Sequence, residues 1–198
     1  MNHTIGNNPA DKELIDRILR GDNRAFGIVI KNTERLVAQI VFKLIPVAED
    51  RKDLAQDVYL KVFHNLSGFK FQSKLSTWIA QIAYNSCLSW IEKNQKFPPG
   101  NIDEEKIQSQ STEIYFDNSF ESEYRVSRKE ISAILRKEIE NLPSIYQTLV
   151  TLFHHESMSY EELSQITGLP EGTVKSSLYR ARKMMKENLL SKYKKEAL

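Results

Sequence analysis

Several residue types that shape small folds are scarce in this 198-residue chain. Its single cysteine, Cys87, excludes an internal disulfide framework, and its apolar neighbours predict that it is buried. Seven glycines and six prolines are too few for a turn-rich all-β fold and favour long helices. No segment approaches the roughly 20 apolar residues that span a membrane, and the first residues lack the layout of a signal peptide. We therefore expect a cytoplasmic protein that does not insert into a membrane.

Charge is segregated along the chain, although the net charge is only +2. Residues 98–123 contain seven acids and one base, whereas residues 175–195 contain eight bases and one acid. The total charge therefore does not identify a nucleic-acid-binding protein, but the basic C-terminal segment is compatible with one.

Apolar residues recur at helical spacing on both sides of the acidic segment. Leu54, Val58, Val62 and Leu66 are each four residues apart, and Ser76 is a candidate N-cap for the helix that follows them. The helices are expected at 13–20, 23–45, 51–66, 76–94, 124–140, 145–154, 160–167 and from 171 onward. For the helix at 124–140, the expected inner face consists of Ile131, Ile134, Leu135 and Ile139.

The pattern predicts an all-α protein of two helical domains joined by a flexible acidic linker. We expect the first domain at 10–95, the linker at 96–123 and the second domain at 124–198.

Residues 160–182 have the spacing of a helix-turn-helix. Ser159 and Glu162 form a capping-box pattern, and Gly168 permits a tight turn before the second helix. Leu163, Ile166, Val174 and Leu178 are expected to face inward. The outward residues of the second helix suit a DNA major groove and its phosphates; they are Glu171, Thr173, Lys175, Ser176, Tyr179, Arg180 and Lys183. The alternative is an α-hairpin in a bundle with a solvated basic end.

Four segments of the C-terminal half resemble region 4 of extracytoplasmic-function (ECF) sigma factors, the small members of the sigma-70 family. They are Leu142–Tyr146, Ser159–Leu163, Gly172–Ser176 and Arg180–Lys183. Response regulators have similar recognition helices, so this half alone is ambiguous. In the N-terminal half, Asp53–Phe63 and Leu75–Asn85 resemble region 2 of the same factors, which removes most of the ambiguity.

The resemblance implies that the chain binds core RNA polymerase, directs it to specific promoters and assists promoter melting, with no cofactor, metal or catalytic residue. It places region 2 in the first domain and region 4, with the helix-turn-helix that binds the minus-thirty-five element, in the second. The implied polymerase contacts are Asp53, Gln56, Asp57 and Lys61. The residues implied to bind the minus-ten element are Phe69, Lys70, Phe71, Gln72, Ser73, Lys74, Trp78 and Asn85. Aromatic rings can stack on an unpaired base there, while lysines meet phosphates, although one of the two phenylalanines is expected to pack on the core instead.

The chain departs from the family pattern in both halves. Gln81 and Tyr84 stand where many relatives have arginine, and Ser177 replaces a frequent arginine in the recognition helix. The change in the recognition helix makes the promoter sequence unpredictable, and the shortage of bases near Trp78 predicts that the free protein binds DNA negligibly. The resemblance also implies an anti-sigma protein as a partner, and we expect the free chain to be monomeric.

Two other functions are weaker alternatives. A stand-alone helix-turn-helix regulator would require a sensor or dimerisation domain, of which the sequence shows no sign. An enzyme would require a recognisable site, but His64, His154 and His155 have no ligand or triad partner at a known spacing. No glycine-rich phosphate loop is present either.

Overall fold

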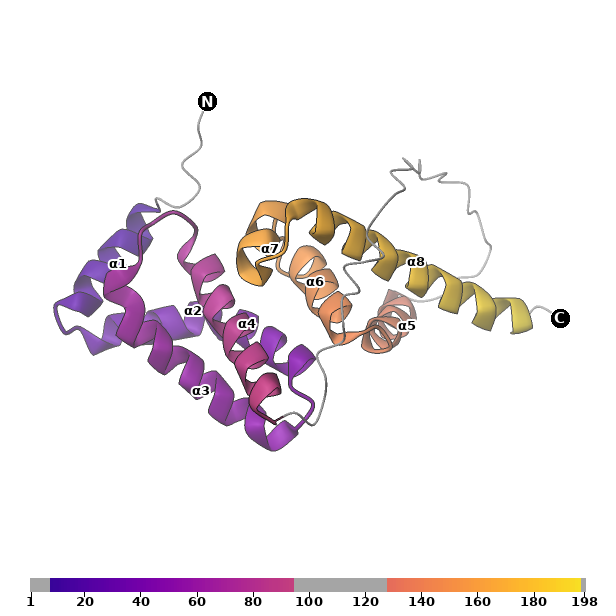
Figure 1. Cartoon of the computed structure of the whole chain (residues 1–198), viewed down its shortest axis with the longest axis horizontal. Helices are drawn as coiled ribbons and strands as arrows, with labels where there is room; N and C mark the ends of the chain where they lie inside the picture. The colour runs from indigo at the N-terminus through magenta and orange to yellow at the C-terminus, as the bar shows by residue number, and fades with distance from the viewer. Residues whose placement is uncertain (1–7, 95–127, 197–198) are drawn as a thin grey trace, which may run out of the picture.

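The computed structural model describes residues 8–94 and 128–196, and these residues form helices and no strand. The predicted linker, 96–123, lies outside the described residues. Figure 1 shows two groups of helices side by side, with the α1–α4 group in indigo to magenta and the α5–α8 group in orange to yellow. The all-α prediction is confirmed.

The N-terminal group consists of α1 (Pro9–Leu19), α2 (Asn23–Leu44), α3 (Ala48–Asn65) and α4 (Leu75–Asn94). The apolar faces of these helices form its core, and the four-residue spacing on α3 works as predicted, since Leu54, Val58 and Val62 are buried. The short 3-10 helix η1 (Leu66–Gly68) follows α3. Helix α4 begins at Leu75, so Ser76 lies inside its first turn and the N-cap prediction is wrong.

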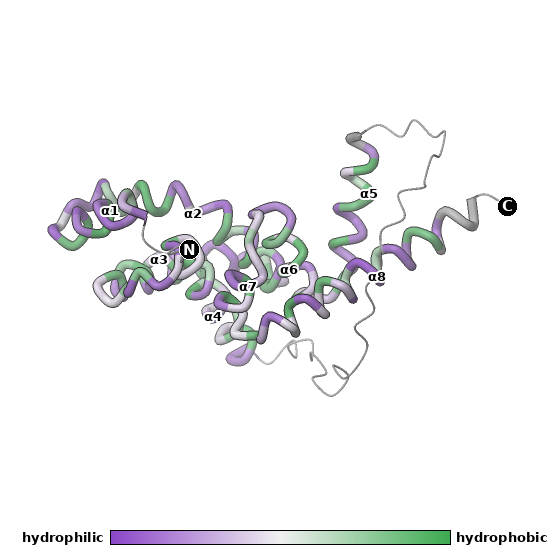
Figure 2. The backbone as a smooth tube through the Cα atoms, turned by 90° about the horizontal axis from the view of Figure 1, so that it is seen from above, coloured by the Kyte–Doolittle hydropathy of each residue, from purple (hydrophilic) through white to green (hydrophobic). Residues whose placement is uncertain are grey.

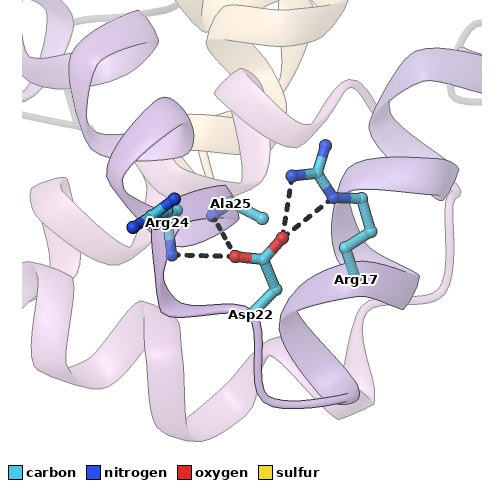
Figure 3. A network of polar contacts seen from close by, with 4 residues as sticks. All are labelled: Arg17, Asp22, Arg24 and Ala25. Atoms are coloured by element: carbon cyan, nitrogen blue, oxygen red, sulfur yellow. Dashed lines mark hydrogen bonds and ion pairs between the residues drawn. The ribbon is translucent and has the colours of Figure 1, made fainter.

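The corner between α1 and α2 is fixed by Asp22 (Figure 3). Its Oδ1 accepts the backbone N–H groups of Arg24 and Ala25 at 3.0 and 3.2 Å, which caps α2. Its Oδ2 accepts both Nε and Nη2 of Arg17, at 3.0 and 2.7 Å. The Arg17 guanidinium is the main reason that the pKa of Asp22 lies below its ordinary value. Gly21, with φ of 94°, supplies the backbone conformation that this corner needs.

The C-terminal group consists of α5 (Arg128–Glu140), α6 (Ser144–His154), α7 (Tyr160–Thr167) and α8 (Glu171–Glu196). The predicted capping box is present: Ser159 Oγ accepts the Glu162 N–H at 3.1 Å, and Glu162 Oε2 accepts the Ser159 N–H at 2.9 Å. Gly168 ends α7 in the left-handed conformation, with φ of 73°. The four expected inward residues of the helix-turn-helix are all buried: Leu163, Ile166, Val174 and Leu178.

The inner face predicted for α5 is wrong in part. Ile131 and Leu135 remain 46% and 41% exposed, whereas Glu138 is only 2% exposed. Helix α5 extends away from the α1–α4 group (Figure 2), and its main packing partners among the described helices are α6 and α8. The buried Glu138 carboxylate pairs there with the Lys192 ammonium of α8. A helix that packs mainly through one end leaves its remaining apolar residues in solvent, which the periodicity cannot indicate.

The two groups pack directly on each other. Helix α7 lies against α4, α6 lies against α2, and buried residues from both groups belong to one hydrophobic cluster. Polar contacts cross the same boundary. The Lys74 Nζ and Thr77 Oγ1 atoms lie 2.9 and 3.2 Å from Glu162 Oε1, and Arg35 Nη2 lies 2.7 Å from Glu156 Oε1.

Candidate nucleic-acid interface

Helix α8 presents a row of long polar side chains to solvent. Glu171, Lys175, Tyr179 and Lys183 are four residues apart, and all four are exposed. Ion pairs at that spacing link Lys175 to Glu171 at 3.6 Å and Lys183 to Glu187 at 3.9 Å. Such exposed pairs are weak, so the lysines can exchange them for phosphate oxygens at little cost.

The remaining residues predicted for α8 lie beside this row. Thr173, Ser176 and Arg180 are half-buried, and the Ser176 hydroxyl donates to the Thr173 carbonyl at 3.0 Å. Ser177, which stands in place of a frequent arginine, is 2% exposed and faces the core. That substitution therefore affects packing on α7 and α6 rather than a DNA contact. The Lys175 Nζ also lies 5.3 Å from the centre of the Tyr160 ring, which orients it at the start of α8.

The loop before α4 combines a packed aromatic cluster with exposed cations. Phe69 is buried, and its ring centre lies 5.2 Å from that of Trp78 and 4.9 Å from that of Phe71. Phe69 is thus the phenylalanine that packs on the core. Phe71 is half-buried and has a φ of 56°, an unfavourable conformation for a bulky residue. The loop holds this ring in place at a cost in backbone strain.

The polar residues of that loop point in different directions. Lys70, Gln72 and Lys74 are exposed, and Ser73 is half-buried with its hydroxyl donating to the Lys74 carbonyl at 3.3 Å. Only Lys74 has a described partner across the two groups, namely Glu162. On α4 itself, Trp78 is half-buried and Asn85 is exposed, as expected for a residue that contacts a strand.

Helix α3 carries a mixed polar and apolar surface. Asp53, Gln56 and Asp57 are exposed, and Leu60, on the same helical face, is 57% exposed. Lys61 differs, because its ammonium donates to the Ser86 hydroxyl of α4 at 2.9 Å and so braces the N-terminal group. Sequence reasoning missed Leu60, although its position three residues after Asp57 places it on the predicted contact face. A single exposed leucine is common on protein surfaces, so Leu60 by itself does not identify a partner.

No described residues form a cluster of three or more histidine, cysteine or acidic side chains that could hold a metal ion. None of the described helices is both long and apolar enough to cross a bilayer.

Two family models match the two groups of helices in order. The model of sigma-70 region 2 matches residues 29–97, and the model of sigma-70 region 4 matches residues 127–185. The chain belongs to the sigma-70 family. As a sigma factor it acts in transcription initiation, and it is not an enzyme.

Curated relatives identify the group of sigma factors within the family. The chain is 29% identical to the ECF RNA polymerase sigma-E factor of Escherichia coli over 176 residues, which is 87% of this chain and 90% of the relative. It is 27% identical to the RNA polymerase sigma-H factor of Pseudomonas aeruginosa over 180 residues, or 90% and 93% of the two chains. The ECF assignment from the sequence is therefore confirmed.

Solved structures show the same fold. CnrH, solved in complex with the cytosolic domain of CnrY, has a TM-score of 0.61 and 19% identity to this sigma factor, with 92% of this chain and 98% of that chain covered. The sigma factor RpoE of Bartonella quintana, solved with the anti-sigma factor NepR, has a TM-score of 0.58 and 22% identity, with coverage of 83% and 96%.

Proposed function

We propose that this ECF sigma factor binds core RNA polymerase through α3, reads the minus-ten element with the 69–74 loop and α4, and reads the minus-thirty-five element with α8. The observation that carries the proposal is the presence of both sigma-70 regions, in order, each with an exposed surface where the family places its contact. The protein acts in the cytoplasm, where it directs polymerase to specific promoters and assists their melting.

The proposed domain boundaries are 10–95 for region 2, 96–123 for the linker and 124–198 for region 4. The division of labour follows from the chemistry of the surfaces. Asp53, Gln56, Asp57 and the exposed Leu60 suit a protein partner, since carboxylates repel DNA. Lys70, Lys74 and the row on α8 suit phosphates.

An anti-sigma protein is the third proposed partner. The B. quintana sigma factor that shares this fold was solved with such a protein. In this chain the half-exposed apolar residues of α5, Ile131 and Leu135, supply part of an apolar surface for it.

The experiment that tests the proposal is a pull-down with purified core polymerase. We expect stoichiometric binding by the wild-type chain and a marked loss in Asp53→Ala/Gln56→Ala/Asp57→Ala. The matched control is Glu13→Ala/Asp16→Ala, which removes two exposed acids from α1 and should bind normally. Failure of the folded wild-type chain to bind would refute the sigma function, whereas equal binding by the triple variant would refute only the α3 surface.

The DNA surfaces are tested by transcription from a promoter selected with the wild-type holoenzyme. Lys175→Ala/Tyr179→Ala should lower promoter binding without weakening the interaction with polymerase, because both side chains are exposed on α8. Unchanged transcription by this variant would contradict the proposed role of the α8 row.

A further inference from the structure

Two stacked aromatic rings lie beside the start of helix α8, where α6, α7 and α8 pack together (Figure 1). They belong to Phe153, the penultimate residue of α6, and to Tyr160, the first residue of α7. Their centres are 5.0 Å apart and their planes are 20° from parallel. The Lys175 Nζ of α8 lies 5.3 Å from the centre of the Tyr160 ring, within the range of a cation–π interaction. The two rings therefore support one member of the exposed row on α8.

The Tyr160 ring is a fixed support. Its backbone directly follows Ser159, which makes both hydrogen bonds of the capping box with Glu162. The ring is half-buried, packs against the hydrophobic core and stacks on Phe153. A tyrosine side chain has only two rotatable bonds, so these contacts leave it little freedom. The ring is therefore in place before α8 meets any partner.

Lys175 has a second partner, but that partner competes with DNA. The Lys175 ammonium lies 3.6 Å from a Glu171 carboxylate oxygen, and both side chains are about half exposed. Such a pair contributes little, and the ammonium must leave the carboxylate before it can donate fully to an acceptor on DNA. The Tyr160 ring is neutral, and an ammonium above it still has donors directed to its other side. The contact with Tyr160 can therefore persist while Lys175 contacts DNA.

A lysine discriminates between sequences only when its ammonium is confined. An ammonium that is free to move reaches phosphate oxygens beside any sequence, and such contacts carry no sequence information. An ammonium confined at the base edges of the major groove can donate to the O6 and N7 acceptors of guanine, which identify that base. The flexible four-carbon stem of lysine does not provide this confinement by itself. At Lys175, the Tyr160 ring can provide it.

We propose that Tyr160 is a positioning residue for promoter recognition. Its ring holds the Lys175 ammonium where it reads one base pair of the minus-thirty-five element, and without the ring the same ammonium binds phosphates instead. The inference rests on the proposed function, because it assigns Lys175 to a base of that element. It extends the residues that determine specificity from α8 to the start of α7, which does not itself supply the base contact.

Nuclear magnetic resonance of the lysine side chains tests the contact in the free chain. Protons above an aromatic ring resonate upfield, so the ε-methylene signals of Lys175 should be shifted upfield, and Lys175→Met assigns them by their loss. Tyr160→Phe keeps the ring and should keep the shift, whereas Tyr160→Leu should abolish it. Tyr146→Leu is the matched control, because it removes another half-buried tyrosine ring of the C-terminal group and should leave the shift unchanged.

If circular dichroism shows that Tyr160→Leu is misfolded, Tyr160→Met removes the ring but keeps a long apolar side chain. A Lys175 signal that is the same in the wild type and in the folded variant without the Tyr160 ring would overturn the proposal.

The reading step is tested with holoenzyme and promoters that carry single base-pair changes in the minus-thirty-five element. Discrimination is the ratio of the affinities for the selected promoter and for the changed promoter. Lys175→Met should lose discrimination at one base pair, which identifies the base that Lys175 reads. Tyr160→Leu should lose about two- to fivefold at the same base pair, the factor that corresponds to a cation–π interaction at an exposed site. Tyr160→Phe should match the wild type, and Tyr160→Leu/Lys175→Met should be no worse than Lys175→Met alone.

The salt dependence of promoter binding separates a displaced cation from a lost one. Tyr160→Leu keeps the charge of Lys175 near DNA, so the slope of log affinity against log salt should be no shallower than in the wild type. Lys175→Met removes the charge and should make the slope shallower by up to about one.

Three outcomes would overturn the proposal and leave the proposed function standing. They are unchanged discrimination in Tyr160→Leu, unchanged discrimination in Lys175→Met, and an equal loss in the Tyr146→Leu control, which would show a general effect of the fold. A wild-type holoenzyme with no preference for any minus-thirty-five sequence would instead refute the proposed function of α8, and this inference with it.

Discussion

At the scale of single residues, a substitution of Ser159 tests how much the capping box contributes to the free energy of unfolding. Its Oγ accepts the Glu162 N–H at 3.1 Å at the start of α7. Ser159→Ala removes this acceptor, so we expect the free energy of unfolding to fall by about 1 kcal/mol. Urea denaturation followed by circular dichroism measures the change. Ser191→Ala is the matched control, because Ser191 is exposed near the end of α8, and an equal loss in both variants would contradict the capping role.

Burial raises the pKa of Cys87 to about 12 and that of Tyr84 to about 12. Both groups ionise at lower pH in the unfolded chain, at 9.0 and 10.0. Their contribution to stability is therefore complete below those values and is lost as the pH rises toward 12. We expect the urea concentration at the unfolding midpoint to decrease as the pH rises above about 9. In Cys87→Ala this decrease should be less steep than in the wild type, once the loss of stability caused by the cavity at neutral pH is subtracted. A thiol reagent should not label the native protein at neutral pH.

These residue-level features could be predicted from the sequence when their signal was local. The capping box spans four residues, and Gly168 directly follows the helical spacing of Leu163 and Ile166. Cys87 lies in an apolar run and is buried. The role of Lys74 could not be predicted, because its partner Glu162 is far away in the sequence. The conformation of Phe71 could not be predicted either, since a bulky residue rarely adopts a positive φ.

At the scale of helices, periodicity predicted where they form but not always which face they bury. It succeeded on α3, where the neighbours α2 and α4 cover one full side. It failed on α5, whose main packing partners among the described helices are α6 and α8, and there Leu135 stays in solvent while Glu138 is buried. The same reasoning missed Leu60, because an exposed leucine has no signal of its own outside the family comparison.

The buried Glu138 carboxylate gives a test of how α5 is held. Its Oε1 pairs with Lys192, and its Oε2 is buried without a hydrogen-bond partner among the described residues. Lys192→Met leaves the carboxylate unpaired and should destabilise the C-terminal group by about 1–3 kcal/mol. Glu138→Met/Lys192→Met replaces both groups by apolar chains and should be close to neutral. Chemical denaturation of the four members of this cycle measures the coupling, and additive single effects would contradict the pairing.

At the scale of the whole molecule, the sequence predicted two helical groups and not their packing on each other. Each group has its own apolar periodicity, which does not indicate that the two apolar cores join into one cluster, and the polar residues that cross the boundary, such as Arg35 and Thr77, are scattered along the chain. In the sequence, these polar residues have the same pattern as an ordinary solvated surface. The packed arrangement therefore emerges only when α4 and α7 are placed together, and it is the feature most sensitive to conditions.

Acid should weaken the packing of α7 on α4 by protonating Glu162, which accepts bonds from Lys74 and Thr77. Burial alone would raise the pKa of Glu162, but hydrogen bonds from the Ser159 N–H and the Lys74 ammonium outweigh it and hold the pKa below its ordinary value of 4.5. A depressed pKa means that the bonds of Glu162 Oε1 to Lys74 and Thr77 stabilise the folded chain fully above pH 4.5, and that this stabilisation is lost as the pH falls through the lower pKa of the folded state.

Energy transfer between fluorophores on Asp16→Cys of α1 and Lys186→Cys of α8, both exposed positions, should therefore stay constant from about pH 7 to about pH 5 and fall below that range, before helical structure is lost. The side chain introduced by Glu162→Gln cannot titrate, so this variant should show less energy transfer at neutral pH and no further decrease in acid. The Glu161→Gln variant should show the same decrease in acid as the wild type. A proton on Glu162 removes the negative charge that attracts the Lys74 ammonium. A step of equal size in Glu162→Gln would assign the acid response to other carboxylates and contradict the role of Glu162 in holding the two groups of helices together.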